Sequence, residues 1–219
     1  MSNFTTWRSL VDGEEILAIP DSVVSHFDAR EENVGTLSSF TDQVGNYDLS
    51  GSAEVISDGI NGQETVRLDG SEIMSNDSIQ INQPHVIVAV FQQQSNSSED
   101  HIFDSTSSSG RRMFRDDGGD YSIFFGDSGV TGGSPDTDHH VVVIEARSGE
   151  DRVEIDGDVI IDGESGDDDM EGFTIGADRN EEDRAEVDFG EIMHLEDPSD
   201  SDISDQRDRM ADDWGISLD

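Results

Sequence analysis

Short runs in which apolar and polar residues alternate recur along the whole chain. The run His85–Gln92 is apolar from Val86 to Phe91, which predicts a central strand buried on both faces. Further runs with period two are bounded by Gly, Asp, Ser or Asn, and each predicts a strand of its own. These predicted strands are Ile16–Ile19, Val23–Asp28, Thr36–Gln43, Glu64–Asp69, Ile102–Phe103, Met113–Phe114, Tyr121–Phe125, His139–Ala146, Val153–Ile155, Val159–Ile161, Phe173–Ile175 and Val187–Leu195. Many short strands separated in this way predict an all-β sandwich or barrel.

One helix is predicted near the C-terminus, from about Asp205 to Trp214. Ser204 can cap its first turn, and Gly215 suits the left-handed position that follows the last turn. Met210 and Trp214 lie four residues apart and therefore share one face of the helix. We expect that face to lie on the edge of the sandwich.

The length and the even distribution of strands predict one folded domain. A β-sandwich often exceeds 200 residues as a single unit, and this chain has 219. Residues 1–15 are weakly patterned, and we expect them to form an N-terminal lead-in that serves as an anchor. Residues 16–219 are expected to form the single domain.

The charge of the chain is extreme. There are 52 acidic and 12 basic residues, every basic residue is Arg, and the formal net charge is -40. The acidity runs the whole length of the chain, which predicts adaptation to concentrated salt, where the Debye length is only about 3 Å and self-repulsion is screened. The alternative is an acidic module that meets basic or calcium partners at ordinary salt. This charge excludes nucleic acids and anionic membranes as partners.

Membrane insertion and thiol chemistry are also excluded by the sequence. The longest apolar run, Val86–Phe91, is too short to cross a bilayer. Residues Met1–Leu10 lack the apolar core of a signal peptide. Cysteine is absent, so there is no disulfide framework.

Several motifs, in order along the chain, together resemble a known family. They are Phe40–Tyr47, Ile60–Gly70, Val153–Gly157, Phe189–Met193, Ile203–Asp205 and Asp213–Ile216. They are similar to segments of the concanavalin A-like or laminin-G-like jelly-roll domains found in phage and archaeal-virus tail or virion proteins and in cell-surface proteins. The resemblance covers roughly residues 23–217. Phe40 replaces a tryptophan of the family pattern, and Asp213 replaces a lysine.

The resemblance implies a jelly-roll β-sandwich of the concanavalin A-like type with one short C-terminal helix. It also implies a non-enzymatic structural or adhesion protein, such as a tail, spike or head-decoration protein of a halophilic archaeal virus. Such a protein would assemble in the host cytoplasm and be exposed on the particle surface. Its partners would be further copies of itself in a homo-oligomer, other virion proteins and host surface glycans. The sequence does not assign the residues that bind a ligand.

An enzyme of the same fold is the main alternative. Glu186, Asp188 and Glu191 read E-x-D-x-x-E, a pattern that glycoside hydrolases of this fold place on one strand. Period two puts the first two on one face, and a bulge would bring the third into line. However, the segment also matches an ordinary strand of the resembled family, and acidic triplets arise by chance in so acidic a chain. We therefore expect no enzymatic role; a halophilic cell-surface carbohydrate-binding module is a further alternative.

Calcium or another divalent cation is the one cofactor that the sequence suggests. Hard cations bind clustered carboxylates, and one loop offers Asp167, Asp168, Asp169 and Glu171. Further acidic loops lie at residues 116–120 and 178–183. None has the spacing of a calcium-binding loop of the EF-hand type, so a hydrated acidic surface is the alternative.

Two other clusters of residues are candidate sites. His139 and His140 adjoin on a predicted strand, where neighbouring side chains point to opposite faces, which argues against a shared metal. Arg111, Arg112 and Arg115 form the only basic concentration along the sequence. They could bind a sugar or a carboxylate, but we expect them to pair with nearby acidic residues.

Overall fold

The computed structural model describes residues 9–11, 14–16 and 19–218, apart from 97–99, 108–112 and 127. Near the N-terminus, β1 (Ser9–Val11) and β2 (Glu14–Ile16) form an antiparallel hairpin that pairs only with itself within the described ranges. The boundary between residues 15 and 16 stays a prediction. No helix in the described part of the chain combines the length and the apolar character needed to cross a membrane.

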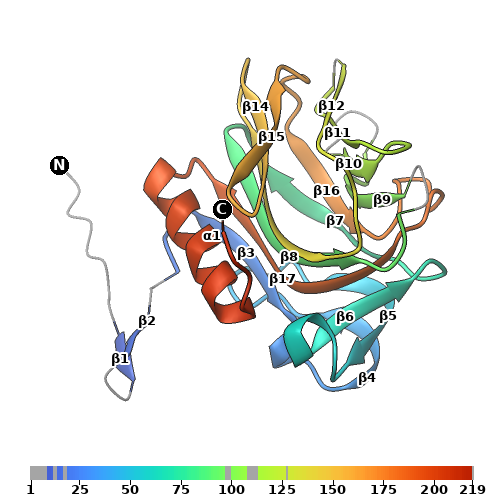
Figure 1. Cartoon of the computed structure of the whole chain (residues 1–219), viewed down its shortest axis with the longest axis vertical. Helices are drawn as coiled ribbons and strands as arrows, with labels where there is room; N and C mark the ends of the chain where they lie inside the picture. Colours follow the sequence, from blue (N-terminus) through green and yellow to red (C-terminus); the bar gives the residue numbers. More distant parts are fainter. Residues whose placement is uncertain are drawn as a thin grey trace.

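The body of the protein is a single antiparallel sheet that runs continuously through all the other strands (Figure 1). Its order is β12 (Gly129–Gly132), β11 (Tyr121–Phe124), β10 (Met113–Asp116), β9 (His101–Asp104), β16 (Met170–Ile175), β7 (Met74–Ile81), β5 (Leu49–Ile56), β6 (Thr65–Asp69), β17 (Glu186–Glu196), β8 (His85–Gln93), β13 (His139–Ala146), β14 (Asp151–Ile155) and β15 (Asp158–Gly163). Off this path, β3 (Val23–Asp28) pairs with β17, and β4 (Gly35–Phe40) pairs with β5.

The sheet folds back on itself around one inner core. The two end strands of the sheet, β12 and β15, come together. Gly132 of β12 lies so close to β15 that an added Cβ atom would be 2.1 Å from the backbone carbonyl oxygen of Ile160. Aromatic rings fill the space between the layers, and each fully buried phenylalanine contributes roughly 1.5–3 kcal/mol relative to an exposed one. The largest of these inner side chains are Tyr121, Phe27, Phe40, Phe91, Phe103, Phe114, Phe125, Phe173 and Phe189.

A second core lies on the outer face of the sheet, under the helix α1 (Asp200–Trp214). The central strand β8 contributes to both cores, as its apolar run predicted. Positions 87, 89 and 91 belong to the inner core, and positions 86, 88 and 90 pack under α1. Ile203, Met210 and Trp214 form the buried face of the helix. The helix therefore covers the outer face of the sheet and does not lie on its edge (Figure 1).

The helix begins five residues earlier than the sequence predicted. Ser199, and not Ser204, caps it: the Ser199 hydroxyl accepts from the backbone N–H of Asp202 at 3.1 Å. The Asp202 carboxylate in turn accepts from the backbone N–H of Ser199 at 3.1 Å. This reciprocal capping box and the acidic residues of the first turn favour the earlier start. Gly215 has a φ of 66° and ends the helix, as predicted.

In the main sheet, three strands were not predicted: β5, β7 and β12. All three carry Gly, Ser or Asn where an alternating apolar face would be expected. They form because neighbouring strands supply hydrogen-bond partners, which a pattern within one segment does not reveal.

The motif Phe40–Tyr47 shapes a turn. The buried carboxylate of Asp42 accepts hydrogen bonds from the backbone N–H groups of His26, Val44 and Tyr47 at 2.9, 3.1 and 3.1 Å. A side chain at Gly45 would meet the Val24 carbonyl oxygen at 2.7 Å, which explains the glycine. This motif is occupied in holding its own loop together.

The motif Ile60–Gly70 fastens the end of α1. Asn61 has a φ of 50°, and its amide donates to the carbonyl oxygen of Trp214 at 2.6 Å. Gln63 donates to the carbonyl oxygen of Asp213 at 2.9 Å. Gly190 of β17 completes the seat of the helix, because a side chain there would meet the Trp214 ring at 2.7 Å. These motifs of the sequence resemblance thus stabilise a turn and the position of α1 on the sheet.

Candidate functional site

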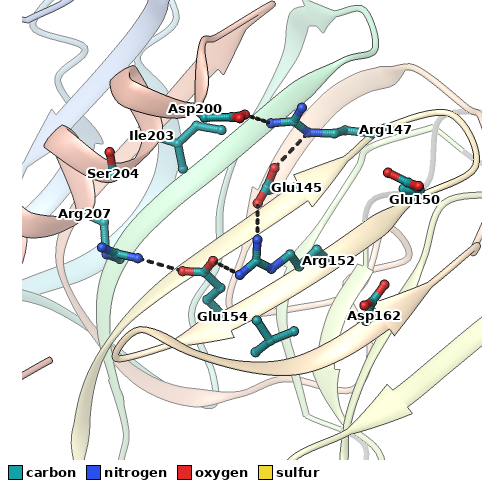
Figure 2. Close-up of a pocket in the computed structure, with 11 residues that line it drawn as sticks. Glu145, Arg147, Glu150, Arg152, Glu154, Asp162, Asp200, Ile203, Ser204 and Arg207 are labelled. Atoms are coloured by element: carbon teal, nitrogen blue, oxygen red, sulfur yellow. Dashed lines mark hydrogen bonds and ion pairs between the residues drawn. The ribbon is translucent and has the colours of Figure 1, made fainter. Parts of the chain in front are cut away.

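A pocket of about 760 Å³ lies between the first half of α1 and the outer face of β13, β14 and β15 (Figure 2). Most of its lining is charged, and Val159, Ile203 and Ser204 complete it. The charged residues are the arginines Arg147, Arg152 and Arg207 and the acidic residues Glu145, Glu150, Glu154, Asp162 and Asp200. We call these eleven residues the α1 pocket.

Ion pairs link the helix to the strands across the α1 pocket (Figure 2). Arg207 pairs with Glu154 at 3.0 Å, and Glu154 pairs with Arg152 at 2.5 Å. Arg152 lies 3.9 Å from Glu145, which pairs with Arg147 at 2.8 Å. Partial burial lowers the pKa of Arg147 and of Arg207, but the adjoining carboxylates more than offset this and raise it, so both remain charged.

The helix contributes one face to the α1 pocket. Asp200, Ile203, Ser204 and Arg207 are spaced three and four residues apart, so they line up along the same side of α1. Asp200 closes the series of ion pairs, because its carboxylate lies 3.1 Å from Arg147. The early start of the helix, fixed by its capping box, is what brings Asp200 to this position.

The strands contribute their outward-facing positions. Arg152 and Glu154 flank the inward-facing Val153 of β14, and Glu145 occupies an outward position of β13. Sequence reasoning missed this site, because it assigned no ligand-binding residues and expected the arginines that it singled out to pair internally. Period two in β14 was the available signal, since it places an arginine and a glutamate on one face of a strand in a chain with few basic residues.

Two carboxylates of the α1 pocket carry no ion pair. Glu150 and Asp162 are exposed, and neither side chain takes part in a hydrogen bond or ion pair among the described residues. Figure 2 shows both beside the paired residues, without a contact to them. Their oxygens are free to accept hydrogen bonds from a ligand.

A second charged group, the Glu191 cluster, lies under the second half of α1. It consists of Glu191, His26, Arg30, Arg209 and Trp214. The buried Glu191 carboxylate accepts from Arg209 at 2.5 Å, from His26 at 2.7 Å, from the Trp214 indole at 3.1 Å and from Arg30 at 3.2 Å. Burial would raise the pKa of Glu191, but the hydrogen bond from His26 and the charge of Arg209 outweigh it and lower the pKa to about 2.

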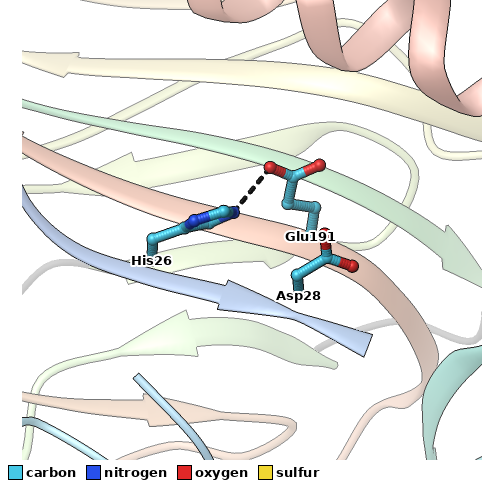
Figure 3. A group of neighbouring side chains, drawn as sticks. All are labelled: His26, Asp28 and Glu191. Carbon is cyan, nitrogen blue, oxygen red and sulfur yellow. Dashed lines mark hydrogen bonds and ion pairs between the residues drawn. The ribbon is translucent and has the colours of Figure 1, made fainter. Parts of the chain in front are cut away.

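The Glu191 cluster is poorly suited to a metal ion. His26, Asp28 and Glu191 offer ligand atoms within 4.8 Å of one another, and Figure 3 shows them together. However, Arg30 pairs with Asp28 at 2.7 Å, and Arg209 already neutralises Glu191. A divalent cation would have to displace two guanidinium groups, so we interpret this group as a structural ion-pair network.

The three acidic residues of the E-x-D-x-x-E pattern differ in burial and in their hydrogen-bond partners. Asp188 is buried and accepts from Arg67 at 2.7 and 2.6 Å and from Gln94 at 3.0 Å. Glu186 is exposed, and Glu191 is the centre of the cluster just described. The bulge that was expected between the last two residues is present, at Gly190. It brings Glu191 to the helix side of the sheet, where arginine and tryptophan occupy its oxygens.

The four residues predicted to bind calcium, Asp167, Asp168, Asp169 and Glu171, lie where β15 leads into β16. Asp169 accepts from the backbone N–H of Gln83 at 2.9 Å, and the backbone N–H of Asp168 donates to the Phe125 carbonyl at 3.1 Å. Within the described ranges, the group that brings three ligand atoms within 4.8 Å is a different one, around Glu191. Calcium binding in this loop stays a prediction.

The further acidic loops use their carboxylates internally. Asp178 accepts from the backbone N–H groups of Asn180 and Glu182 at 3.0 and 2.6 Å. In the other loop, Asp117 pairs with Arg115 at 3.0 Å, which confirms the internal pairing expected for that arginine. Arg111 and Arg112 lie outside the described residues.

His140 joins two carboxylates on neighbouring segments. Its Nδ1 lies 2.6 Å from Asp156, and its Nε2 lies 2.9 Å from Asp136. Burial lowers the pKa of His140, but the hydrogen bonds to these carboxylates outweigh it and raise the pKa to about 9. Both ring nitrogens are engaged, so the imidazole acts as a charged clamp between the loop before β13 and the hairpin of β14 and β15.

No protein-family model and no curated protein matches the chain. Solved structures do match. Domain 4 of an extracellular GH43 arabinanase from Geobacillus stearothermophilus, in complex with arabinotriose, has a TM-score of 0.66 at 12% identity and covers 84% of this chain and 97% of that chain. Trypanosoma rangeli sialidase in complex with 2,3-difluorosialic acid has a TM-score of 0.68 at 15% identity and covers 98% of this chain and 37% of that chain.

The binding domain of botulinum neurotoxin DC in complex with SialylT also matches, with a TM-score of 0.64 at 12% identity, over 87% of this chain and 51% of that chain. The chain therefore spans nearly all of the arabinanase domain but only about a third of the sialidase and half of the toxin chain. These matches confirm an all-β sandwich.

The expectation that the chain has no enzymatic role is corrected by this comparison. The structures that share its fold include a sialidase and a domain of an arabinanase, so the fold occurs in carbohydrate-active enzymes. At 12–15% identity the likeness shows the fold alone and assigns no reaction to this chain.

Proposed function

We propose that this chain is a carbohydrate-binding domain that holds its ligand in the α1 pocket. The observation that carries the proposal is the lining of that pocket. Arginine N–H groups donate hydrogen bonds and carboxylate oxygens accept them, and sugar hydroxyls do both. A pocket of about 760 Å³ is large enough for one or more sugar rings.

The similar structures support this proposal. Arabinotriose is bound to the arabinanase domain, and SialylT to the toxin domain. We further propose that the sandwich is of the concanavalin A-like or laminin-G-like type, which the motifs of the sequence resemblance support. Those motifs mainly shape turns and the seat of α1; Glu154, Ile203 and Ser204 of the pocket lining belong to them, and the other eight lining residues do not.

We also propose a setting: the exposed surface of a particle of a halophilic archaeal virus, with further copies of the chain and other virion proteins as neighbours. The sequence resemblance and the net charge of -40 support it. Mass spectrometry of purified particles tests this setting. Presence of the chain in particles supports it, and its consistent absence from particles and cell surfaces contradicts it.

A glycan array in molar potassium chloride tests the binding function. We expect the wild-type protein to bind a restricted set of oligosaccharides. Ser204→Phe places a bulky side chain in the α1 pocket without changing its charge, and should weaken binding at least ~10-fold. Ser201→Phe is the matched control, because Ser201 is an exposed serine of the same helix outside the pocket lining.

Binding that is equal in both variants would place the ligand elsewhere and contradict the proposed site. Failure of the wild-type protein to bind any oligosaccharide would contradict the function. Each bound oligosaccharide should also be analysed for cleavage products, since the fold occurs in enzymes. Circular dichroism of both variants checks that the fold is retained.

A further inference from the structure

The charges that line the α1 pocket limit the class of sugar that the pocket can bind. Three arginines face five carboxylates, so the lining carries an excess of negative charge. The rest of the chain adds to this excess, since its net charge is -40. A sugar that carries a carboxylate or sulfate would enter a negative site on a negative protein.

The arginines do not offset this, because carboxylates already neutralise them. Arg147 lies within 3.1 Å of both Glu145 and Asp200, and Arg207 lies within 3.0 Å of both Glu154 and Asp208. Arg152, the most exposed of the three, pairs with Glu154 at 2.5 Å. A ligand carboxylate would have to displace these internal partners to gain a bidentate ion pair.

Glu150 and Asp162 offer the opposite chemistry. Each is an exposed carboxylate without a partner in the described part of the chain, and each lies on the lining of the pocket. A carboxylate with both oxygens free accepts two hydrogen bonds side by side, which matches two hydroxyls on adjacent sugar carbons. No group of three metal-ligand atoms in the described ranges includes either residue, so a bound metal is not their evident role.

An apolar contact is also present. Val159 lines the pocket and is 46% exposed, although its side chain is large and apolar. The C–H face of a sugar ring can cover such a side chain while its hydroxyls turn to the carboxylates.

From this arrangement we infer that the α1 pocket selects a neutral oligosaccharide with adjacent hydroxyl pairs, and that Glu150 and Asp162 accept those hydroxyls. This inference rests on the proposed carbohydrate-binding function. It separates this pocket from sites that recognise an acidic sugar through free arginines.

Isothermal titration in molar potassium chloride tests the inference with two probes, neutral arabinotriose and a sialic acid-terminated trisaccharide, after a glycan array has shown which neutral oligosaccharides bind. Wild-type protein should bind arabinotriose or a neutral oligosaccharide from the array, and should not bind the sialylated probe. Asp162→Asn and Glu150→Gln should each weaken that binding roughly ten- to a hundredfold, since each removes a charged acceptor. Asp158→Asn is the matched control, because Asp158 is an exposed aspartate of the same strand outside the pocket lining.

Binding of acidic sugars alone, or binding that Asp162→Asn and Glu150→Gln leave unchanged, overturns the inference but leaves the carbohydrate-binding function standing. Absence of binding to any sugar overturns both. Because both carboxylates are exposed and have no partner in the part of the chain that the structure describes, the two variants should fold like the wild type, and near-identical unfolding curves confirm this.

Discussion

The two halves of α1 cover two different charged networks on the same outer face of the sheet. Under the second half, the carboxylate of Glu191 is buried and receives hydrogen bonds from His26, Arg30, Arg209 and Trp214. Under the first half, the arginines of the α1 pocket are half-buried, and two of its carboxylates, Glu150 and Asp162, have no partner among the described residues. The first network is complete without a ligand, whereas the second is not.

The difference between the two networks shows that the sequence motifs lie mainly at residues that hold the fold together. Gly190, Asn61 and Trp214 belong to the motifs of the sequence resemblance, and all three serve to seat the helix beside the Glu191 cluster. Of the eleven residues of the α1 pocket, only Glu154, Ile203 and Ser204 belong to those motifs. A fold can therefore keep its structural joints while the residues of the pocket vary with the ligand.

The largest effect is expected in the Glu191 cluster. Glu191→Gln removes the buried anion at the centre of the network and leaves Arg30 and Arg209 only their ion pairs with Asp28 and Asp213, which should lower the free energy of unfolding by ~3–5 kcal/mol. Denaturant unfolding in molar potassium chloride measures this. Since the folded pKa is depressed, the contribution is full above pH 4.5 and is lost as the pH falls toward about 2, so the difference from wild type should shrink in that window.

Glu186→Gln is the control for this prediction, because Glu186 is an exposed glutamate on the same strand. It should change stability by less than about 0.5 kcal/mol. Equal losses in the two variants would show that the cluster has no special role in stability.

At Arg152 in the α1 pocket we expect a small loss of stability and a larger loss of glycan binding. Arg152→Gln breaks an ion pair of a side chain that is 42% exposed, so it should lower stability by only ~0.2–1 kcal/mol. Glycan binding should fall about 10-fold, a loss of ~1.4 kcal/mol in binding free energy. A large loss of stability with unchanged binding would erase the distinction between the two networks.

The Ser199 cap should affect the first half of α1, which lines the α1 pocket, more than the second half, which covers the Glu191 cluster. Ser199→Ala should cost about 1 kcal/mol of stability, because one N-terminal N–H loses its acceptor. The first turn also positions Asp200 and Ser204, so glycan binding should weaken together with stability. Hydrogen exchange should rise in the first turns of α1 and stay unchanged around Trp214. Uniform exchange along the helix would contradict independent halves.

The smallest effect concerns His140, whose network is intermediate in burial. The folded pKa of about 9 exceeds the ordinary value of 6.5, so its stabilisation is full below pH 6.5 and is lost as the pH rises through 9. His140→Gln should be less stable than wild type by no more than ~1 kcal/mol at pH 6 and equal to it above pH 10. A difference that persists at high pH would show that packing, and not charge, holds this clamp.

The sequence predicted those elements whose information is local. Strands such as β8 and β13 were found because alternation or an apolar run reveals them, and Gly215 marked the end of the helix. β5 and β7 were missed because their partners, not their own residues, make them strands. The α1 pocket depends on contacts such as Arg207 with Glu154, which are 53 residues apart in the chain, so the local pattern of β14 indicates one charged strand face but not the pocket. The calcium prediction at Asp167, Asp168, Asp169 and Glu171 drew on local acidity alone.

The most direct test of this account is a crystal structure of the protein, grown in molar potassium chloride, with the neutral oligosaccharide that it binds most tightly. The account predicts that the sugar lies between α1 and the strands β13, β14 and β15, with hydroxyls within hydrogen-bond distance of Glu150 and Asp162. A sugar bound on another surface, with these two carboxylates still free, would contradict it.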